Sequence, residues 1–156
     1  LAGLMPLLVL PPIGYLLWLV RRGKLADIYM PERETRLRPL TLIMVWALVC
    51  LMLARRWEAP PVVEFFVVAA IVLTGILSLV TLFWKISFHG ATISAAATAT
   101  LMVAGSSAWP MMLLVPLVGW ARVRLKRHTL RQVVYGSLVG ALIALLLVHG
   151  ILLRVL

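Results

Sequence analysis

Six long apolar stretches, separated by short polar segments, make up most of this chain of 156 residues. They lie at 2–20, 40–54, 61–84, 91–107, 108–121 and 132–153. A helix needs about 20 apolar residues to cross a bilayer, so we expect the second and fifth stretches to extend into their flanks. The first stretch lacks a basic leading segment, which favours a membrane span over a signal peptide. The pattern predicts an all-α integral membrane bundle of about six transmembrane helices, forming one domain over residues 1–156.

Two features inside the stretches bear on how the helices pack. The fourth stretch is rich in Ala, Ser and Thr, small residues that allow membrane helices to approach closely. Pro11, Pro12, Pro110 and Pro116 fall within apolar stretches. We expect kinks there, with neighbouring groups supplying hydrogen bonds to the carbonyls that each proline leaves without a donor.

Composition agrees with a membrane protein and narrows its partners. Hydrophobic residues make up 63% of the chain and charged residues 13%, against roughly 45–50% and about 25% in soluble domains. The formal charge of +10 has no soluble basic domain to carry it, which argues against a nucleic-acid partner. Membrane lipids with anionic or phosphorylated headgroups are the better partners. Cys50 is the single cysteine, so an internal disulfide is excluded.

The basic residues are distributed unevenly between the two membrane faces. With six spans, the segments after the odd-numbered spans share one face, and that face collects all Lys and Arg except Arg55, Arg56 and Arg154. The positive-inside rule places this face in the cytoplasm and both termini outside. We expect the membrane to be the inner (cytoplasmic) membrane of a bacterium. The residues on that face are Arg21, Arg22, Lys24, Arg33, Arg36, Arg38, Lys85, Arg122, Arg124, Lys126, Arg127 and Arg131.

Two histidines lie at span ends on this same face. His89 and His128 are both flanked by cations, whereas His149 reads as an ordinary helix residue. Lys85 and His89 are four residues apart, which would put them on one helical face with Ser87 between them. Neighbouring positive charge disfavours the imidazolium form, so we expect a neutral, nucleophilic histidine. Cations, a nucleophile and a proton donor are the groups needed for phosphoryl transfer through a covalent intermediate.

The segment from Ala121 to Gln132 carries a longer pattern. It reads Ala121-Arg122, five residues, His128, three residues, Gln132. This spacing resembles the Ser-Arg-x5-His-x3-Asp motif of the membrane-bound type 2 phosphatidic acid phosphatases, the lipid phosphate phosphatases that share their site with the vanadium haloperoxidases. The family's second motif, Pro-Ser-Gly-His, corresponds to Ile86-Ser87-Phe88-His89. Its first, Lys-x6-Arg-Pro, survives only as Arg38-Pro39, with Pro31 at the lysine position.

The resemblance implies a role for each matched residue. His128 would be the nucleophile that becomes phosphohistidine, and His89 would protonate the leaving oxygen and later activate water. Arg38, Arg122 and Ser87 would bind phosphoryl oxygens. The family acts on phosphatidate, phosphatidylglycerol phosphate and polyprenyl phosphates, and it needs no metal or other cofactor.

Three departures from the family pattern bear on activity. Gln132 stands where an aspartate orients the nucleophile; an amide can hold the histidine tautomer but cannot stabilise positive charge on the ring. Phe88 replaces a glycine and adds bulk near the phosphate pocket. We expect Lys85 to supply the cation missing at Pro31.

These features leave two interpretations open. The chain is a metal-independent lipid phosphatase, or it is a family member without catalytic activity that serves as an accessory subunit among other transmembrane subunits. A transporter or channel is less well supported, because Glu64, near a helix start, is the only carboxylate within a span.

Overall fold

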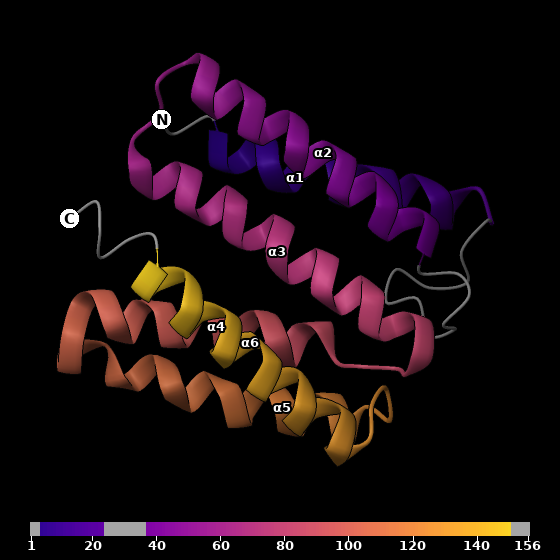
Figure 1. Cartoon of the computed structure of the whole chain (residues 1–156). Coiled ribbons are helices and arrows are strands. Elements are labelled where there is room, and N and C mark those ends of the chain that lie inside the picture. The colour runs from indigo at the N-terminus through magenta and orange to yellow at the C-terminus, as the bar shows by residue number, and fades with distance from the viewer. Residues whose placement is uncertain (1–3, 24–36, 151–156) are drawn as a thin grey trace. The chain divides into compact units, whose positions relative to one another are not determined.

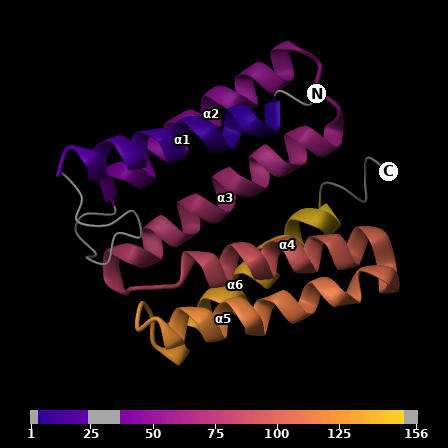
Figure 2. The same cartoon turned by 180° about the vertical axis from the view of Figure 1, so that it is seen from behind.

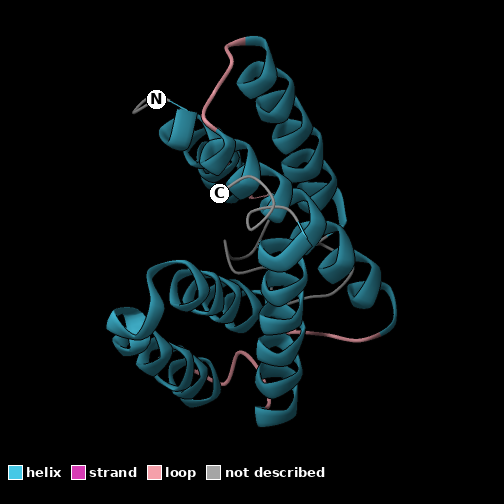
Figure 3. Ribbon diagram, turned by 60° about the vertical axis from the view of Figure 1, so that its left-hand side comes forward, coloured by secondary structure: helices cyan, strands magenta, loops and turns pink. Residues whose placement is uncertain are grey.

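The computed structural model describes residues 4–23 and 37–150, and every element within those ranges is helical (Figures 1 and 3). The predicted all-α class is therefore confirmed. The side chains of a few residues inside the ranges, including Arg38, lie outside the description. The helices are α1 (Leu4–Arg21), α2 (Leu37–Arg56), α3 (Pro61–Phe83), α4 (Phe88–Ala104), the 3-10 helix η2 (Gly105–Leu113), α5 (Leu114–Arg124) and α6 (Leu130–Gly150).

Four helical stretches of the described chain are long and apolar enough to cross a membrane, which makes the protein a multi-pass integral membrane protein. They are Pro39–Arg56, Pro61–Phe83, Phe88–Arg124 and Leu130–Gly150; the apolar part of α1, Val9–Arg21, is shorter. As predicted, the short apolar stretches at 40–54 and 108–121 extend into their flanks, as α2 and as η2 with α5.

The chain divides into two compact units, Leu1–Ser78 and Leu79–Leu156, which we describe separately. In the first unit α1 packs on α2. Pro11 has no N–H to donate to the carbonyl of Leu7 one turn earlier. The indole Nε1 of Trp46 on α2 donates to that carbonyl oxygen at 2.9 Å. The expectation that a neighbour would satisfy a carbonyl freed by proline is confirmed at Pro11.

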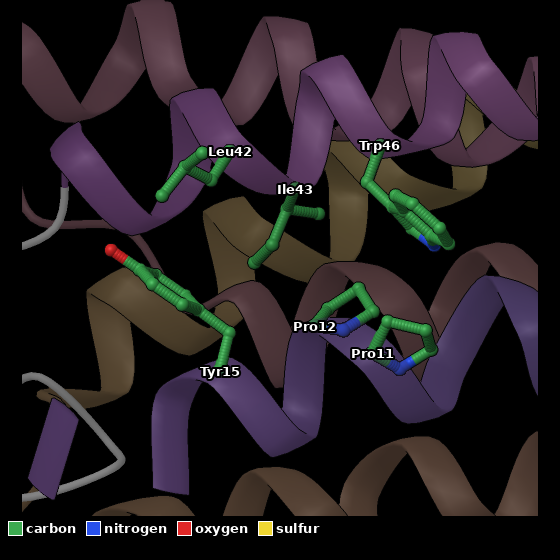
Figure 4. A pocket seen from close by; sticks show the side chains of 6 residues that line it. All are labelled: Pro11, Pro12, Tyr15, Leu42, Ile43 and Trp46. Atoms are coloured by element: carbon green, nitrogen blue, oxygen red, sulfur yellow. The ribbon is translucent and has the colours of Figure 1, made fainter. Parts of the chain in front are cut away.

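A small apolar cavity of about 200 Å³ lies beside this hydrogen bond. Figure 4 shows Pro11, Pro12 and Tyr15 of α1 facing α2 across it, where Leu42, Ile43 and Trp46 form the opposite wall. At the other end of α2, Arg55 pairs with Glu64 in the first turn of α3 at 3.6 Å. Glu64 thus lies at a helix start, as the sequence indicates.

In the second unit α4 contacts α6, η2 and α5, and its interface with α6 is built from small residues. Gly136 and Gly140 of α6 form a Gly-x-x-x-Gly pair, a sequence signal of close helix packing that adds to the small residues of α4. A Cβ on Gly140 would lie 2.0 Å from the carbonyl oxygen of Ala91, and one on Gly136 would lie 2.6 Å from that of Ser87. The two backbones therefore approach too closely for any larger residue.

The reversal between α4 and η2 depends on Gly105. Its φ of 70° and ψ of −158° belong to a region that only glycine occupies readily. Because the chain turns at this residue, η2 and α5 return alongside α4, as Figures 1 and 2 show. The run Phe88–Arg124 is therefore a helical hairpin and not one straight rod.

Candidate functional site

The loop between α5 and α6 places His128 next to Arg122 through backbone hydrogen bonds. The carbonyl oxygen of Arg122 accepts from the N–H of Arg127 at 3.1 Å and of His128 at 3.4 Å, while Lys126 N–H donates to Val123 at 2.9 Å. This is a Schellman cap, in which the residue after the helix adopts a left-handed conformation. Lys126 occupies that position with a φ of 53°. The cap explains the spacing of the motif, since six residues return the chain to the arginine.

The first turn of α6 begins with a capping box. The hydroxyl oxygen of Thr129 accepts from Gln132 N–H at 3.3 Å, and Gln132 Oε1 accepts from Thr129 N–H at 3.1 Å. The pattern Thr-x-x-Gln is the sequence signature of this arrangement. The sequence therefore carries a local signal that gives Gln132 a structural role, beside its place at the aspartate position of the family motif.

Gln132 Oε1 also lies 3.2 Å from Nδ1 of His128. The spacing of four residues predicts this contact, and it is confirmed. A backbone N–H is always a donor, so the bond from Thr129 identifies the atom facing it as the amide oxygen. That oxygen can only accept, so Nδ1 of His128 must carry the proton. In the neutral form of the ring, Nε2 is then the nitrogen that carries no proton.

The second motif meets the third through the backbone of Ser87, whose N–H donates to the carbonyl oxygen of Gln132 at 3.2 Å. The Ser87 side chain is fully buried and caps α4 by accepting from Gly90 N–H at 3.2 Å. Its hydroxyl thus has a structural role, and direct contact with phosphate stays a prediction. His89 follows in the first turn of α4, with an exposed side chain.

One expectation about this segment is wrong. α3 ends at Phe83, and the Ser87 cap starts α4 at Phe88, three residues before the predicted start. Lys85 therefore lies between the two helices and does not share a helical face with His89. Lys85 lies in the connection after α3, where the neighbouring Trp84 ring packs edge-on against Tyr135 of α6 at a centroid distance of 5.5 Å. Lys85 itself is partly exposed.

The electrostatics of this unit are one-sided. All five Asp and Glu residues of the chain lie at or before Glu64, so residues 79–156 contain no acidic side chain. Arg122 is in the last turn of α5, with its Nε buried, and Arg124, Lys126, Arg127 and Arg131 lie close to it along the chain. A cationic site without carboxylates favours an anion supplied from outside the unit. Among the residues that the structure describes, no three potential metal ligands cluster.

The remaining predicted phosphate ligand is untested. Arg38 is the second residue of α2, in the first unit, and its side chain lies outside the description. Pro31, at the position of the missing lysine, lies outside the described residues. The structure therefore brings together Ser87, Arg122, His128 and Gln132, with His89 two residues beyond Ser87.

The fold and the site together define a class of protein. It is a multi-pass helical membrane protein in which a histidine is held where two helices meet, in a unit without Asp or Glu. The family model of the PAP2 superfamily matches residues 78–155, half of the chain and nearly the whole second unit. The chain belongs to the PAP2 superfamily, which makes it a lipid phosphate phosphatase-like protein. No curated protein and no solved structure matches it.

Proposed function

We propose that this protein hydrolyses a phosphomonoester or diphosphate of a membrane lipid, polyprenyl or glycerolipid, through a phosphohistidine at His128. The observation that carries the proposal is the hydrogen bond from His128 Nδ1 to Gln132, which fixes the tautomer of the ring so that Nε2 is the nitrogen without a proton. A nucleophile held in one tautomer by a neighbouring side chain, with its backbone hydrogen-bonded to that of an arginine, supports phosphoryl transfer to this histidine.

In the first step Nε2 of His128 attacks phosphorus, and the bond from phosphorus to the lipid oxygen breaks. The departing oxygen takes a proton from His89, releasing the lipid alcohol, or the lipid monophosphate from a diphosphate. In the second step His89, now neutral, takes a proton from water as the water oxygen attacks phosphorus. The nitrogen–phosphorus bond breaks, its electron pair returns to Nε2, and inorganic phosphate leaves.

Binding of the phosphoryl group follows from the charge of the site. Arg122 provides planar donors of the kind that bind phosphate in pairs, and Lys85 and Arg38 add positive charge. Residues 79–156 contain no Asp or Glu to compete for Arg122 and Lys85. The dianionic substrate and the charge that develops during transfer are stabilised by the same groups.

The proposed membrane arrangement has six crossings, with the motif segments in the cytoplasm. The reversal at Gly105 supports this, because it makes α4 one arm of a hairpin and η2 with α5 the other. α1 would supply the first crossing. The orientation rests on the bias of Lys and Arg toward the motif face.

A second candidate is an accessory subunit that has lost catalysis. The observation that favours it is the capping box, because Gln132 has a structural role at this position that needs no chemistry. Gln132 also supplies no negative charge to stabilise His128 as it becomes a positively charged intermediate. Such a subunit would use its apolar helix faces to bind other transmembrane subunits.

Phosphate release from a panel of lipid phosphates separates the two candidates. The panel contains phosphatidate, phosphatidylglycerol phosphate and a polyprenyl diphosphate, each presented to purified protein in detergent micelles. We expect release from at least one substrate, abolished by His128→Ala and retained by the matched control His149→Ala on α6. No release from any substrate, by a folded protein, would favour the accessory subunit.

A further inference from the structure

A groove of about 410 Å³ runs along α4 beside α5, within the second unit. The α4 residues in its lining fall at positions 88, 89, 92, 93 and 96, a repeat of four that keeps them on one face of the helix. They are Phe88, His89, Thr92, Ile93 and Ala96, and Val118 of α5 completes the lining. The groove therefore begins at a candidate catalytic histidine and continues into a membrane span.

The groove has the size and chemistry of a site for a single hydrocarbon chain. From Phe88 to Ala96 the helix rises about 12 Å, less than half of the hydrocarbon thickness of a bilayer of about 30 Å. A helix about 10 Å wide would occupy roughly 900 Å³ over that length, about twice the volume of the groove. A partner helix would therefore lie mostly outside the groove, whereas a thinner occupant can lie within it. Apart from His89 and Thr92, the lining is apolar.

We infer that this groove binds the hydrocarbon chain of the phosphorylated lipid whose headgroup is hydrolysed at His128 and His89. The inference rests on the proposed function. His89, at the site end of the groove, lies where the headgroup oxygen would leave. Phe88, at the same end, contacts the first part of the chain, which gives a role to a residue that replaces the family's glycine.

Ala96 determines the depth of the groove. It is an exposed small side chain on the groove face, one turn beyond Thr92. A phenylalanine there would fill the end of the groove farthest from His89. It would not enter the buried α4–α6 interface, which is formed by other residues of α4. The end of the groove next to His89 would stay open to a short hydrocarbon chain.

The test compares two substrates with the same headgroup, a phosphatidate with hexadecanoyl chains and one with butanoyl chains. For Ala96→Phe we expect KM for the long-chain substrate to rise about tenfold or more, the range associated with a misfit in an apolar pocket. KM for the short-chain substrate and kcat for both should stay within about twofold of wild type. Leu142→Phe, which adds the same ring on the exposed face of α6, is the matched control and should change neither.

The outcomes separate the groove from the catalytic proposal. Unchanged kinetics of Ala96→Phe, or an equal loss on both substrates, would overturn the groove inference while leaving hydrolysis established. If the wild type releases phosphate neither from these two substrates nor from the rest of the panel, the proposed function fails, and chain binding is then read by photocrosslinking with a phosphatidate carrying a diazirine in its chain. We expect competable crosslinks within residues 88–96 and at Val118. Labelling spread evenly over α4 and α6 would contradict the groove assignment.

Discussion

The residue at position 132 gives the sharpest test of how the site works. Gln132 Oε1 accepts from both Thr129 N–H and His128 Nδ1, at 3.1 and 3.2 Å. Gln132→Glu keeps the side-chain length, and so both acceptor contacts, and adds a negative charge beside the ring. When Nε2 of His128 bonds to phosphorus the ring becomes positive, and the added carboxylate stabilises that charge.

The expected gain can be bounded from the separation of the two charges. Opposite unit charges about 4 Å apart interact by about 1 kcal/mol in water and about 4 kcal/mol at an effective dielectric constant of 20. Because each 1.36 kcal/mol is a factor of ten, Gln132→Glu should raise kcat by between roughly fivefold and roughly a thousandfold. Gln132→Asp should also raise it, but less, since the shorter side chain reaches both donors less well.

Removing the acceptor should have the opposite effect. Gln132→Ala breaks half of the capping box and releases the histidine ring, so we expect lower kcat and a loss of about 1 kcal/mol of stability. Initial rates of phosphate release and thermal melting in micelles measure the two effects separately. The reasoning is refuted if Gln132→Glu melts like wild type but is no faster, or if Gln132→Ala keeps full activity.

Three further predictions concern the scaffold and the orientation. Lys126→Gly should relieve the left-handed strain and raise the free energy of unfolding by up to about 1 kcal/mol, whereas Lys126→Ala should not; equal melting of the two would contradict this. Trp46→Phe should lower the free energy of unfolding by about 0.6 kcal/mol. The loss should be smaller in a Pro11→Ala background, because the alanine N–H then donates to the Leu7 carbonyl; an equal loss in both backgrounds would contradict this prediction. In a background without the native cysteine, impermeant maleimide added to intact cells should label Glu58→Cys and not Arg124→Cys, and the reverse pattern would invert the proposed orientation.

Hydropathy alone predicted most of the helices, because burial in lipid requires long apolar runs whatever the tertiary contacts are. The start of α4 was misplaced by three residues, since the side chain of Ser87, and not hydrophobicity, determines it. The contact between His128 and Gln132 followed from helical spacing. The bond from Ser87 to Gln132 has no periodic signal, because it depends on the close approach of α4 and α6.

Two local sequence patterns do indicate where α6 begins and where it packs against another helix. The Gly-x-x-x-Gly pair at Gly136 and Gly140 indicates where α6 meets another helix. The Thr-x-x-Gln pattern indicates where α6 begins and gives Gln132 a structural role. Arg38 belongs to the other unit of the chain, and local patterns do not predict contacts between segments so far apart in sequence.

The central claim, that His128 becomes covalently phosphorylated, can be measured directly. Purified protein is mixed with a lipid phosphate carrying radiolabelled phosphate, quenched in alkali and digested, since a phosphohistidine survives alkali and is lost in acid. We predict one labelled peptide containing His128, with acid-labile label, absent from His128→Ala and present in His149→Ala. Release of phosphate without label on His128, or label that survives acid, would contradict the account.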